Sequence, residues 1–200
     1  MASANLSGAV LVGGRSTRMG RDKARLLFDG QPLWRRQLRL LECIGANPVR
    51  LVLRPRQRSF GDRTREIRDS VENAGPLSGL LAALTAAPTP WLAVLAVDMP
   101  HLDATWFRRL RRLCRPGVGA VVMVPAGYEP LAAIYPHTAR TIVARRLHGE
   151  KLALQDLVAE LVRRRKMKVL RLPASEGWRT ANWNTPADLR RGRRRLLRVA

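Results

Sequence analysis

The sequence predicts an α/β fold, specifically a three-layer α/β/α sandwich with a mostly parallel central sheet. One observation is that several short, strongly apolar runs lack alternating polar positions, which is typical of strands buried on both faces of a sheet. The other is that longer amphipathic segments separate these runs. Strand then helix, repeated along a chain, indicates a parallel sheet covered by helices on both faces, and the handedness of such crossovers allows few topologies.

Each predicted element follows from its local pattern. The clearest buried strands are residues 8–12, 49–53, 91–97 and 119–124. Weaker strands are expected near Ile67 and at residues 130–135 and 166–172. Helical spacing of apolar residues predicts helices at residues 32–45, 75–87, 104–114, 137–147, 151–164 and 185–198. Pro32 suits the first turn of the first helix, and Thr185 and Pro186 suit the start of the last. No repeat or low-complexity linker interrupts the pattern, so residues 1–200 are expected to form one domain.

The composition is that of a folded protein. An apolar fraction of 46% and a charged fraction of 26% are ordinary for a globular chain. Cys43 and Cys114 show no metal-ligand spacing, so we expect structural thiols in a reducing compartment. The N-terminus does not resemble a signal peptide, and no apolar stretch approaches the roughly 18 residues needed to span a bilayer. The sequence therefore predicts a soluble, cytoplasmic protein without membrane contact.

The positive charge of the chain is unusual, with a formal net charge of +22. Residues 1–100 contain 15 Lys/Arg and 8 Asp/Glu, whereas residues 101–200 contain 22 and 7. The excess is concentrated at residues 108–115, 163–168 and 190–198. Such a charge bears on partners and association rates, not on fold. It is interpreted first as solvated helix faces and second as a nucleic-acid surface, but few aromatic residues and no recognisable binding motif make nucleic acid an unfavoured partner.

A glycine-rich, basic loop, GGRSTRMGRDK, follows the first predicted strand. Gly13 and Gly14 allow a tight turn that brings backbone amides close to a ligand, and successive amides form an anion-binding concavity. Arg15, Arg18 and Lys23 supply positive charge for phosphate oxygens. The loop matches neither the Walker A pattern nor GxGxxG. Taken alone, it is either a phosphate site or an ordinary solvated turn between a strand and a helix.

Acidic residues follow two other predicted strands. Asp98 comes after seven apolar residues and precedes Met99-Pro100, and Asp69 follows the short strand near Ile67. A carboxylate at the mouth of a buried strand can hold Mg²⁺, which takes few protein oxygens and completes its shell with water and phosphate. Either Asp could instead form a turn. Because ligands of open α/β sheets collect at the carboxyl ends of strands, the glycine-rich loop and Asp98 together describe a nucleotide site.

Five sequence blocks carry a definite resemblance. They are LVGGRSTRMGRDKARLLFDGQPLWRRQL (11–38), DSVENAGPLSGLLAAL (69–84), VDMPHL (97–102), YEPLAAIYP (128–136) and ANWNTPADL (181–189). The first closely resembles the opening of the molybdenum cofactor guanylyltransferase (MobA-type) family, L-x-G-G-x-S-x-R-M-G-x-D-K followed by a Leu-rich step and G-x-P-L. The other blocks occur in family order, so the resemblance covers nearly the whole chain.

The resemblance implies a Rossmann-like fold of the nucleotide-diphospho-sugar transferase type and a Mg²⁺-dependent nucleotidyltransferase. Such enzymes transfer GMP from GTP to the terminal phosphate of molybdopterin and release pyrophosphate. The nucleotide-binding residues carried over are Leu11, Val12, Gly13, Gly14, Arg18, Lys23, Asp69 and Asp98. Among these, Lys23, Arg18 and Asp98 are the expected catalytic residues, with Asp98 as the Mg²⁺ ligand. Asn182 and Asn184 are expected near the metal or the acceptor, although both are also typical of a turn before a helix cap.

The expected reaction needs no general base. A phosphate monoester has a second pKa of about 6, so at pH 7 the acceptor is mostly dianionic and already a nucleophile. In agreement, the sequence has no evident Ser-His-Asp or Cys-His set. His101, His137 and His148 are scattered and are interpreted as structural.

The sequence departs from the family pattern at three places. Val12 stands where many members have Ala, and Arg54 stands where an Asn is common, so Arg54 is left out of the expected contacts. Residues 127–129 also offer a less basic approach to the acceptor than in many members. These departures bear on substrate identity more than on reaction type.

The sequence is also compatible with other functions. A CTP-dependent molybdopterin cytidylyltransferase would share the loop, the Asp and the sheet. A sugar-1-phosphate nucleotidyltransferase fits the NTPADL ending and the short chain less well. From another class, the basic helices could bind nucleic acid or dock molybdopterin-delivering proteins or acceptor molybdoenzymes.

Overall fold

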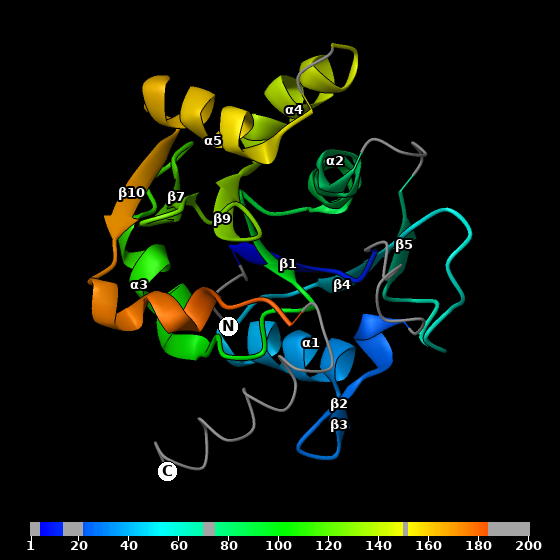
Figure 1. The fold of residues 1–200 in the computed structure, drawn as a ribbon. Coiled ribbons are helices and arrows are strands. Elements are labelled where there is room, and N and C mark those ends of the chain that lie inside the picture. Colours follow the sequence, from blue (N-terminus) through cyan, green and yellow to red (C-terminus); the bar gives the residue numbers. More distant parts are fainter. Residues whose placement is uncertain (1–4, 14–21, 70–74, 150–151, 184–200) are drawn as a thin grey trace.

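The computed structural model describes residues 5–13, 22–69, 75–149 and 152–183. Within these residues, eight strands form one sheet in the order β10-β7-β9-β6-β1-β4-β5, with β8 paired to β7. Helices cover both faces of this sheet (Figure 1). The predicted three-layer α/β/α sandwich is therefore confirmed.

The strands of this sheet, except the short β8, match the predicted strands closely. They are β1 (Leu6–Leu11), β4 (Val49–Leu53), β5 (Glu66–Arg68), β6 (Trp91–Ala96), β7 (Gly119–Val124), β8 (Gly127–Tyr128), β9 (Ala132–Pro136) and β10 (Met167–Arg171). A separate hairpin consists of β2 (Leu27–Phe28) and β3 (Gln31–Pro32), which the sequence pattern did not indicate. Both of its strands are only two residues long, too short for a periodic pattern to develop.

The sheet is mostly parallel, as predicted, with an antiparallel strand inside it. β9 runs antiparallel to both of its neighbours, β6 and β7. The connection from β7 to β9 holds only the short β8 and a turn, whereas a parallel crossover needs a dozen or more residues. The chain therefore folds back, and the segment before β9 lies at the sheet edge where β6 and β7 end.

Two layers of helices bury the faces of the sheet. The helices are α1 (Leu33–Cys43), α2 (Pro76–Ala86), α3 (Ala104–Leu113), α4 (Arg140–Leu147) and α5 (Leu154–Arg163). One core packs α1 and α3 against one face of the sheet, and a second core packs α2, α4 and α5 against the other. Short 3-10 helices are η1 (Lys23–Arg25), η2 (His137–Ala139) and η3 (Ala174–Thr180).

The helices are slightly shorter than predicted, for local reasons. Pro32 lies one position before α1 and not within its first turn. At the other end Gly45 has φ +80°, and the amides of Gly45 and Ala46 donate to the carbonyls of Glu42 and Leu41. This is the bonding pattern of a left-handed glycine that closes a helix. The predicted helix at residues 185–198 lies outside the described residues.

No helix among the described residues combines the length and apolar character that a membrane crossing would require. The cytoplasmic location stays a prediction.

Glu160 of α5 pairs with two arginines of α4 and with Arg164, which directly follows α5. Its side chain is 8% exposed, and its carboxylate pairs with Arg145 at 2.7 Å, Arg146 at 2.7 Å and Arg164 at 2.8 Å. Burial acts to raise the pKa of this carboxyl, but the hydrogen bond and charge of Arg146, followed by the charges of the other two arginines, outweigh burial and lower the pKa.

We expect Glu160→Gln to lower the free energy of unfolding by about 1–3 kcal/mol at pH 7, because it leaves a buried guanidinium edge uncompensated. A lowered folded-state pKa stabilises the protein above the unfolded pKa of about 4.3, and this contribution is lost as the pH falls through the folded pKa. Urea denaturation should therefore show a difference between variant and wild type that shrinks below about pH 4. Glu42→Gln, at a half-exposed pair with Arg65, is the control. An equal loss of unfolding free energy in Glu160→Gln at pH 7 and below about pH 4 would contradict the lowered pKa of Glu160.

Candidate nucleotide site

The predicted site residues lie along the carboxyl edge of the parallel strands. β1 is hydrogen-bonded to β4 on one side and to β6 on the other, parallel to both. The loops that follow these three strands therefore start side by side, with the glycine-rich loop in the middle. This is the edge at which open α/β sheets bind their ligands.

Leu11 and Val12 carry the backbone of β1 into this edge. The Leu11 carbonyl accepts from the amide of Val97 at 3.2 Å, and the Val12 amide donates to the carbonyl of Val52 at 3.1 Å. Both side chains are buried, in the cores on opposite faces of the sheet. These two residues hold the start of the glycine-rich loop in place, and their predicted contact with the nucleotide stays a prediction.

Gly13 has a packing reason to be glycine. A Cβ at this position would lie 2.8 Å from Cγ of Arg54 and 3.2 Å from the Arg54 amide nitrogen, so a larger residue would push against the end of β4. Arg54, left out of the expected contacts, is thus a neighbour of the loop. Gly14 and Arg18 lie outside the described residues, so their predicted roles stay predictions.

Asp22 and Lys23 form the other end of this loop. Asp22 is the N-cap of η1, and its Oδ1 accepts from the Ala24 amide at 3.0 Å, the usual task of an Asp before a helix. Lys23 follows as the first residue of η1, and its Nζ lies 3.5 Å from Oδ2 of Asp98. Two of the three predicted catalytic residues are thereby brought together from segments far apart in the sequence.

Asp98 sits just after β6 in a largely enclosed position. Its side chain is 22% exposed and that of Lys23 is 16% exposed. Burial raises the pKa of the Asp98 carboxyl, and the Lys23 charge opposes this rise without cancelling it. A partly buried carboxylate of this kind gains from a cation beside it.

Glu129 brings a second carboxyl group to the same edge. It lies just before β9, and the backbone carbonyl of Leu131 accepts from the Ala96 amide at 2.7 Å, which joins this segment to β6. Burial raises the pKa of Glu129 to about 7; the Leu131 amide lowers it, and the charge of Asp98 raises it further. The two carboxyl groups therefore influence one another electrostatically.

This donor set fits Mg²⁺. The ion prefers carboxylate oxygen, and it usually takes only one or two protein carboxylates and completes its shell with water and substrate phosphates. The described residues contain no group of three or more His, Cys, Asp or Glu side chains that could enclose a metal. Asp98, with Glu129 as a second carboxylate, offers the sparse oxygen set of a shared protein–phosphate site.

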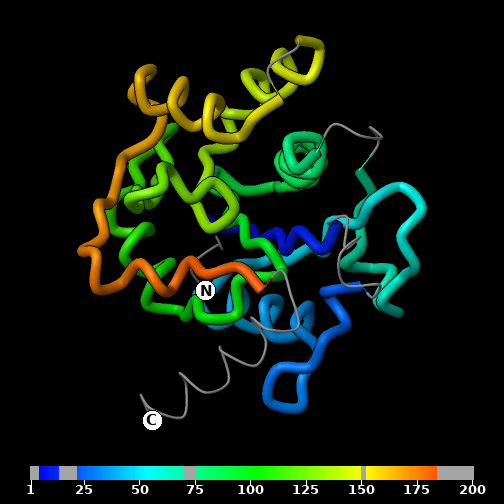
Figure 2. Tube along the Cα trace, viewed as in Figure 1, coloured from blue at the N-terminus to red at the C-terminus, as the bar shows by residue number. Residues whose placement is uncertain are grey.

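A C-terminal strap, defined as residues 172–183, crosses beside Asp98. The Trp183 amide donates to the Asp98 carbonyl at 2.9 Å, and Figure 2 shows the strap running next to the segment after β6. Ion pairs hold the strap against α3, between Arg179 and Asp103 at 2.8 Å and between Arg109 and Glu176 at 2.7 Å. Asn182 is exposed on this strap, directly before Trp183, whereas Asn184 lies outside the described residues.

Trp183 anchors the strap. Its side chain is 2% exposed, packs on Phe28 with ring centroids 5.1 Å apart, and donates from Nε1 to Nε2 of His101 at 3.2 Å. His101 is thus a structural partner, in line with its interpretation from the sequence.

Trp183→Ala should lower the free energy of unfolding by about 3 kcal/mol or more, because it removes a large buried ring. Trp183→Phe keeps an aromatic ring but loses the hydrogen bond to His101 and part of the buried volume, so it should recover only part of that loss. Urea denaturation of the two variants checks this. Equal losses for Phe and Ala would mean that ring packing does not hold the strap.

Asp69 lies farther along the edge, after β5. Its backbone amide donates to the Leu53 carbonyl at 2.8 Å, and its Oδ2 accepts from Ser78 Oγ at 2.5 Å. Since β4 and β1 lie between β5 and β6, the ends of β5 and β6 are about 14 Å apart at the usual strand spacing. Through its bond to Ser78, Asp69 secures the first turn of α2, and its predicted nucleotide contact remains a prediction.

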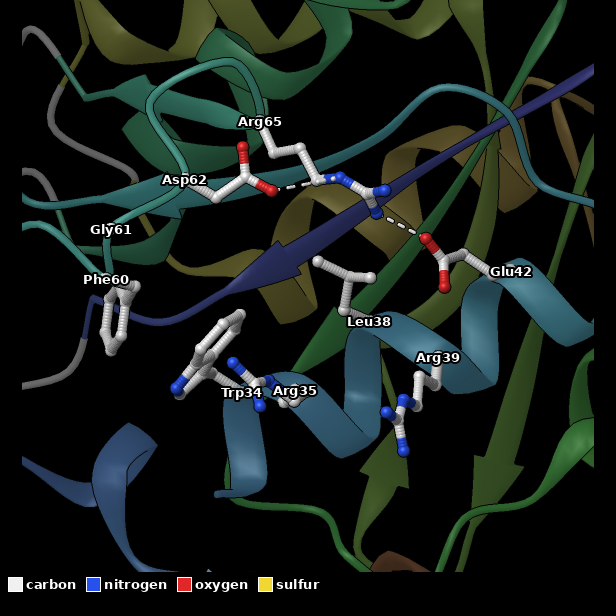
Figure 3. A pocket seen from close by; sticks show the side chains of 9 residues that line it. All are labelled: Trp34, Arg35, Leu38, Arg39, Glu42, Phe60, Gly61, Asp62 and Arg65. Carbon is white, nitrogen blue, oxygen red and sulfur yellow. Dashed lines mark hydrogen bonds and ion pairs between the residues drawn. The ribbon is translucent and has the colours of Figure 1, made fainter. Parts of the chain in front are cut away.

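A shallow pocket of about 310 Å³ lies outside this edge, between the outer face of α1 and the loop before β5 (Figure 3). Trp34 and Phe60 form its aromatic wall, with ring centroids 5.4 Å apart. Arg65 bridges Glu42 and Asp62 across it. None of the residues that line the pocket is a predicted site residue, so the hollow and the nucleotide edge are separate features.

Two of the basic runs lie at the opposite end of the sheet. The segment 108–115 leads into the amino end of β7, and the segment 163–168 leads into the amino end of β10. The Gly119 amide donates to the Lys166 carbonyl at 2.9 Å, which joins the two segments there. Much of the charge excess is therefore remote from the glycine-rich loop.

Sequence reasoning missed three residues at the edge. Glu129 lies in the quoted YEPLAAIYP block, and an acid directly before a buried strand was the available signal. Trp183 lies between the two predicted asparagines, where a lone tryptophan in a polar block could have indicated an anchor. Gln57 bridges Val12 and Asp22, and no local pattern marks it.

The chain is similar to known proteins over most of its length. Residues 8–166 match the family model of the MobA-like NTP transferase domain. The chain is 52% identical over 193 residues to a probable molybdenum cofactor guanylyltransferase of Opitutus terrae, covering 95% of this chain and 96% of that protein. It is 34% identical to the molybdenum cofactor guanylyltransferase of Pseudomonas fluorescens, covering 88% of each. A nucleotidyl transferase from Methanothermobacter superposes with a TM-score of 0.74 at 16% identity, covering 99% of this chain and 100% of that one.

The fold, a mostly parallel sheet with a glycine-rich loop and an acid at its carboxyl edge, is that of the nucleotidyltransferases. Within that class, the chain belongs to the MobA-like NTP transferase family, as the family model and the relatives show. The resemblance stated from the sequence is confirmed.

Proposed function

We propose that this protein is a molybdenum cofactor guanylyltransferase, which transfers GMP from GTP to the terminal phosphate of molybdopterin with Mg²⁺ as cofactor. The names of its relatives support the reaction. The observation that carries the proposal is the placement of Lys23 Nζ 3.5 Å from Asp98 Oδ2 beside the end of β1. A cation and a buried acid at that edge suit a nucleoside triphosphate that arrives with a divalent ion.

In this reaction the dianionic acceptor phosphate is the nucleophile. One of its oxygens forms a bond to the α-phosphorus of GTP, and the bond from the α-phosphorus to the bridging oxygen of pyrophosphate breaks. That oxygen keeps the electron pair, and no proton needs to move. The task of the protein is therefore to hold two polyanions together in line and to offset their charge.

The residues of the edge divide this task. Lys23, held at the start of η1 by its Asp22 cap, can offset charge on the departing pyrophosphate. The Gly13 end of the loop can bring backbone amides to the phosphates. Asp98, with Glu129 nearby, would hold Mg²⁺, which when bound neutralises phosphate oxygens. Because Lys23 and Asp98 already neutralise one another in the free protein, both groups are in position before the nucleotide arrives.

The test is nucleotide choice. The protein is incubated with molybdopterin, Mg²⁺ and each of the four common nucleoside triphosphates, and pyrophosphate is measured. We expect release with GTP, little with the others, and none after chelation of the metal until Mg²⁺ is restored. Preference for CTP would instead support the cytidylyltransferase, and no release with any nucleotide would contradict the proposed class of reaction.

The basic segments offer a candidate docking surface for partner proteins. Docking to proteins that deliver molybdopterin or receive the cofactor is a proposal that rests on the charge of residues 108–115 and 163–168. A pull-down compared at low and high salt tests it, since binding through exposed charges weakens as salt rises. Nucleic acid remains the less favoured partner, for want of a binding motif.

A further inference from the structure

Gln57 occupies the centre of the junction between the two ends of the glycine-rich loop. It is 7% exposed and lies between β4 and β5. Its Nε2 donates to the Val12 carbonyl at 3.1 Å, at the start of the loop, and to Asp22 Oδ2 at 3.0 Å, at its end. Its Oε1 accepts from the Arg54 amide at 3.1 Å. One buried amide thus joins three segments.

The segment that carries Gln57 is itself held in one shape. The backbone amide of Gln57 donates to the Arg54 carbonyl at 3.1 Å and so closes a four-residue turn. Pro55 occupies the second position of this turn, where proline presets the backbone. Arg68 Nη1 reaches the carbonyls of Arg54 at 3.2 Å, Pro55 at 2.9 Å and Gln57 at 3.0 Å from β5. The backbone that carries the Gln57 side chain is therefore held in one conformation.

The chemistry of this junction requires an amide. Both Nε2 protons face oxygen acceptors, and one of those is the carboxylate of Asp22. A glutamate of the same shape would offer no donor and would set a second carboxylate against Asp22. An asparagine is one methylene shorter and could not span the same three partners.

The junction leads to Lys23 in two steps. One oxygen of Asp22 accepts from Gln57, while the other caps η1 through the Ala24 amide. Lys23 lies between Asp22 and Ala24 in the sequence, and its Nζ is 3.5 Å from Oδ2 of Asp98. A shift of Asp22 would therefore displace the first turn of η1 and the ammonium group with it.

We infer that Gln57 is a positioning residue of the nucleotide site, whose buried amide orients Asp22 and so places the Lys23 ammonium at the phosphates of the bound nucleotide. The inference rests on the proposed function for its catalytic consequence. It does not make Gln57 a catalytic residue, since its side chain bonds only to the protein.

The first experiment compares Gln57→Glu with wild type in GTP-dependent pyrophosphate release. We expect kcat to fall about 10- to 100-fold, because misplacing a group by about 1 Å has that order of effect. Gln31→Glu, on the β2–β3 hairpin, adds the same charge elsewhere and should leave kcat unchanged. Thermal unfolding of each variant is measured in parallel. Wild-type kcat in Gln57→Glu would overturn the inference.

The reciprocal variant tests the specific contact. In Gln57→Glu with Asp22→Asn, the amide introduced at position 22 can donate to the carboxylate at position 57, while its oxygen still accepts from the Ala24 amide. The Val12 carbonyl loses its donor in this variant. We expect this double variant to turn over faster than Gln57→Glu but more slowly than wild type, because the bond to Asp22 is restored and the bond to Val12 is not. A double variant no better than the worse single one would mean that the Gln57–Asp22 hydrogen bond does not set the site.

A third comparison separates positioning from general stability. In a Lys23→Ala background, Gln57→Glu should cost less than about 2-fold, since residues that act through one another are not additive. The same loss in both backgrounds would make Gln57 merely structural.

A measurement without substrate separates this inference from the proposed function. Hydrogen exchange of the Ala24 amide should be faster in Gln57→Glu than in wild type, whether or not the protein uses GTP. Unchanged exchange would overturn the inference, whereas wild-type protein inactive with every nucleotide would overturn the proposed function alone.

Discussion

Asp98→Ala is expected to reduce GTP-dependent pyrophosphate release by about 10³-fold or more. A metal held on this carboxylate contributes several kcal/mol to stabilising charge in the transition state, and each 1.36 kcal/mol corresponds to about tenfold in rate. Asp98→Asn keeps the shape and removes the charge, so it should lose as much. Steady-state rates at saturating GTP and Mg²⁺ make the comparison.

The fold should survive this change. Burial raises the pKa of Asp98, so burying its charged form costs free energy, and removing the charge offsets the loss of the Lys23 partner. The Asp98 carbonyl that accepts from Trp183 is retained. Asp29→Asn, in the exposed turn between β2 and β3, is the matched control and should keep full activity. Normal turnover in a folded Asp98→Ala variant would rule out its role.

Lys23→Ala is expected to cost about 10²- to 10³-fold in kcat, the usual effect of removing one preorganised electrostatic donor. The ammonium group lies 3.5 Å from Asp98 and only 16% of the side chain is exposed, so solvent cannot replace it easily. Lys23→Met keeps the apolar stem and should be equally impaired.

The control for this prediction is Lys168→Ala, which removes an exposed lysine of β10 at the far edge of the sheet. It should leave kcat unchanged. Lys23→Met with near-normal kcat would show that the stem, and not the charge, is what the site needs.

The fold could be predicted largely because buried strands and amphipathic helices are local patterns. The runs at residues 49–53 and 119–124 match β4 and β7 residue for residue. The antiparallel direction of β9 was not predicted, since it depends on the short connection through β8 and not on the pattern of the strand itself. The β2–β3 hairpin was missed because its strands are too short to show a period.

Site residues could be predicted where a charged residue follows a buried strand or a glycine-rich loop, because few structural roles explain a charge there. Asp98 after an apolar run and Lys23 after a glycine-rich loop were such cases, and the structure brings them together, although their catalytic roles stay predictions. Gln57 could not be found in this way, because its partners Val12 and Asp22 lie far from it in the sequence. Only the pairing of β1 with β4 brings them within reach.

We propose that this sheet edge joins GMP to a phosphate acceptor. The mass of the product formed from GTP, Mg²⁺ and molybdopterin tests this, with pyrophosphate quantified in the same reaction. We expect molybdopterin enlarged by one GMP, with one pyrophosphate released per product and none without the acceptor. Pyrophosphate released equally without molybdopterin, or an acceptor unchanged in mass, would contradict it.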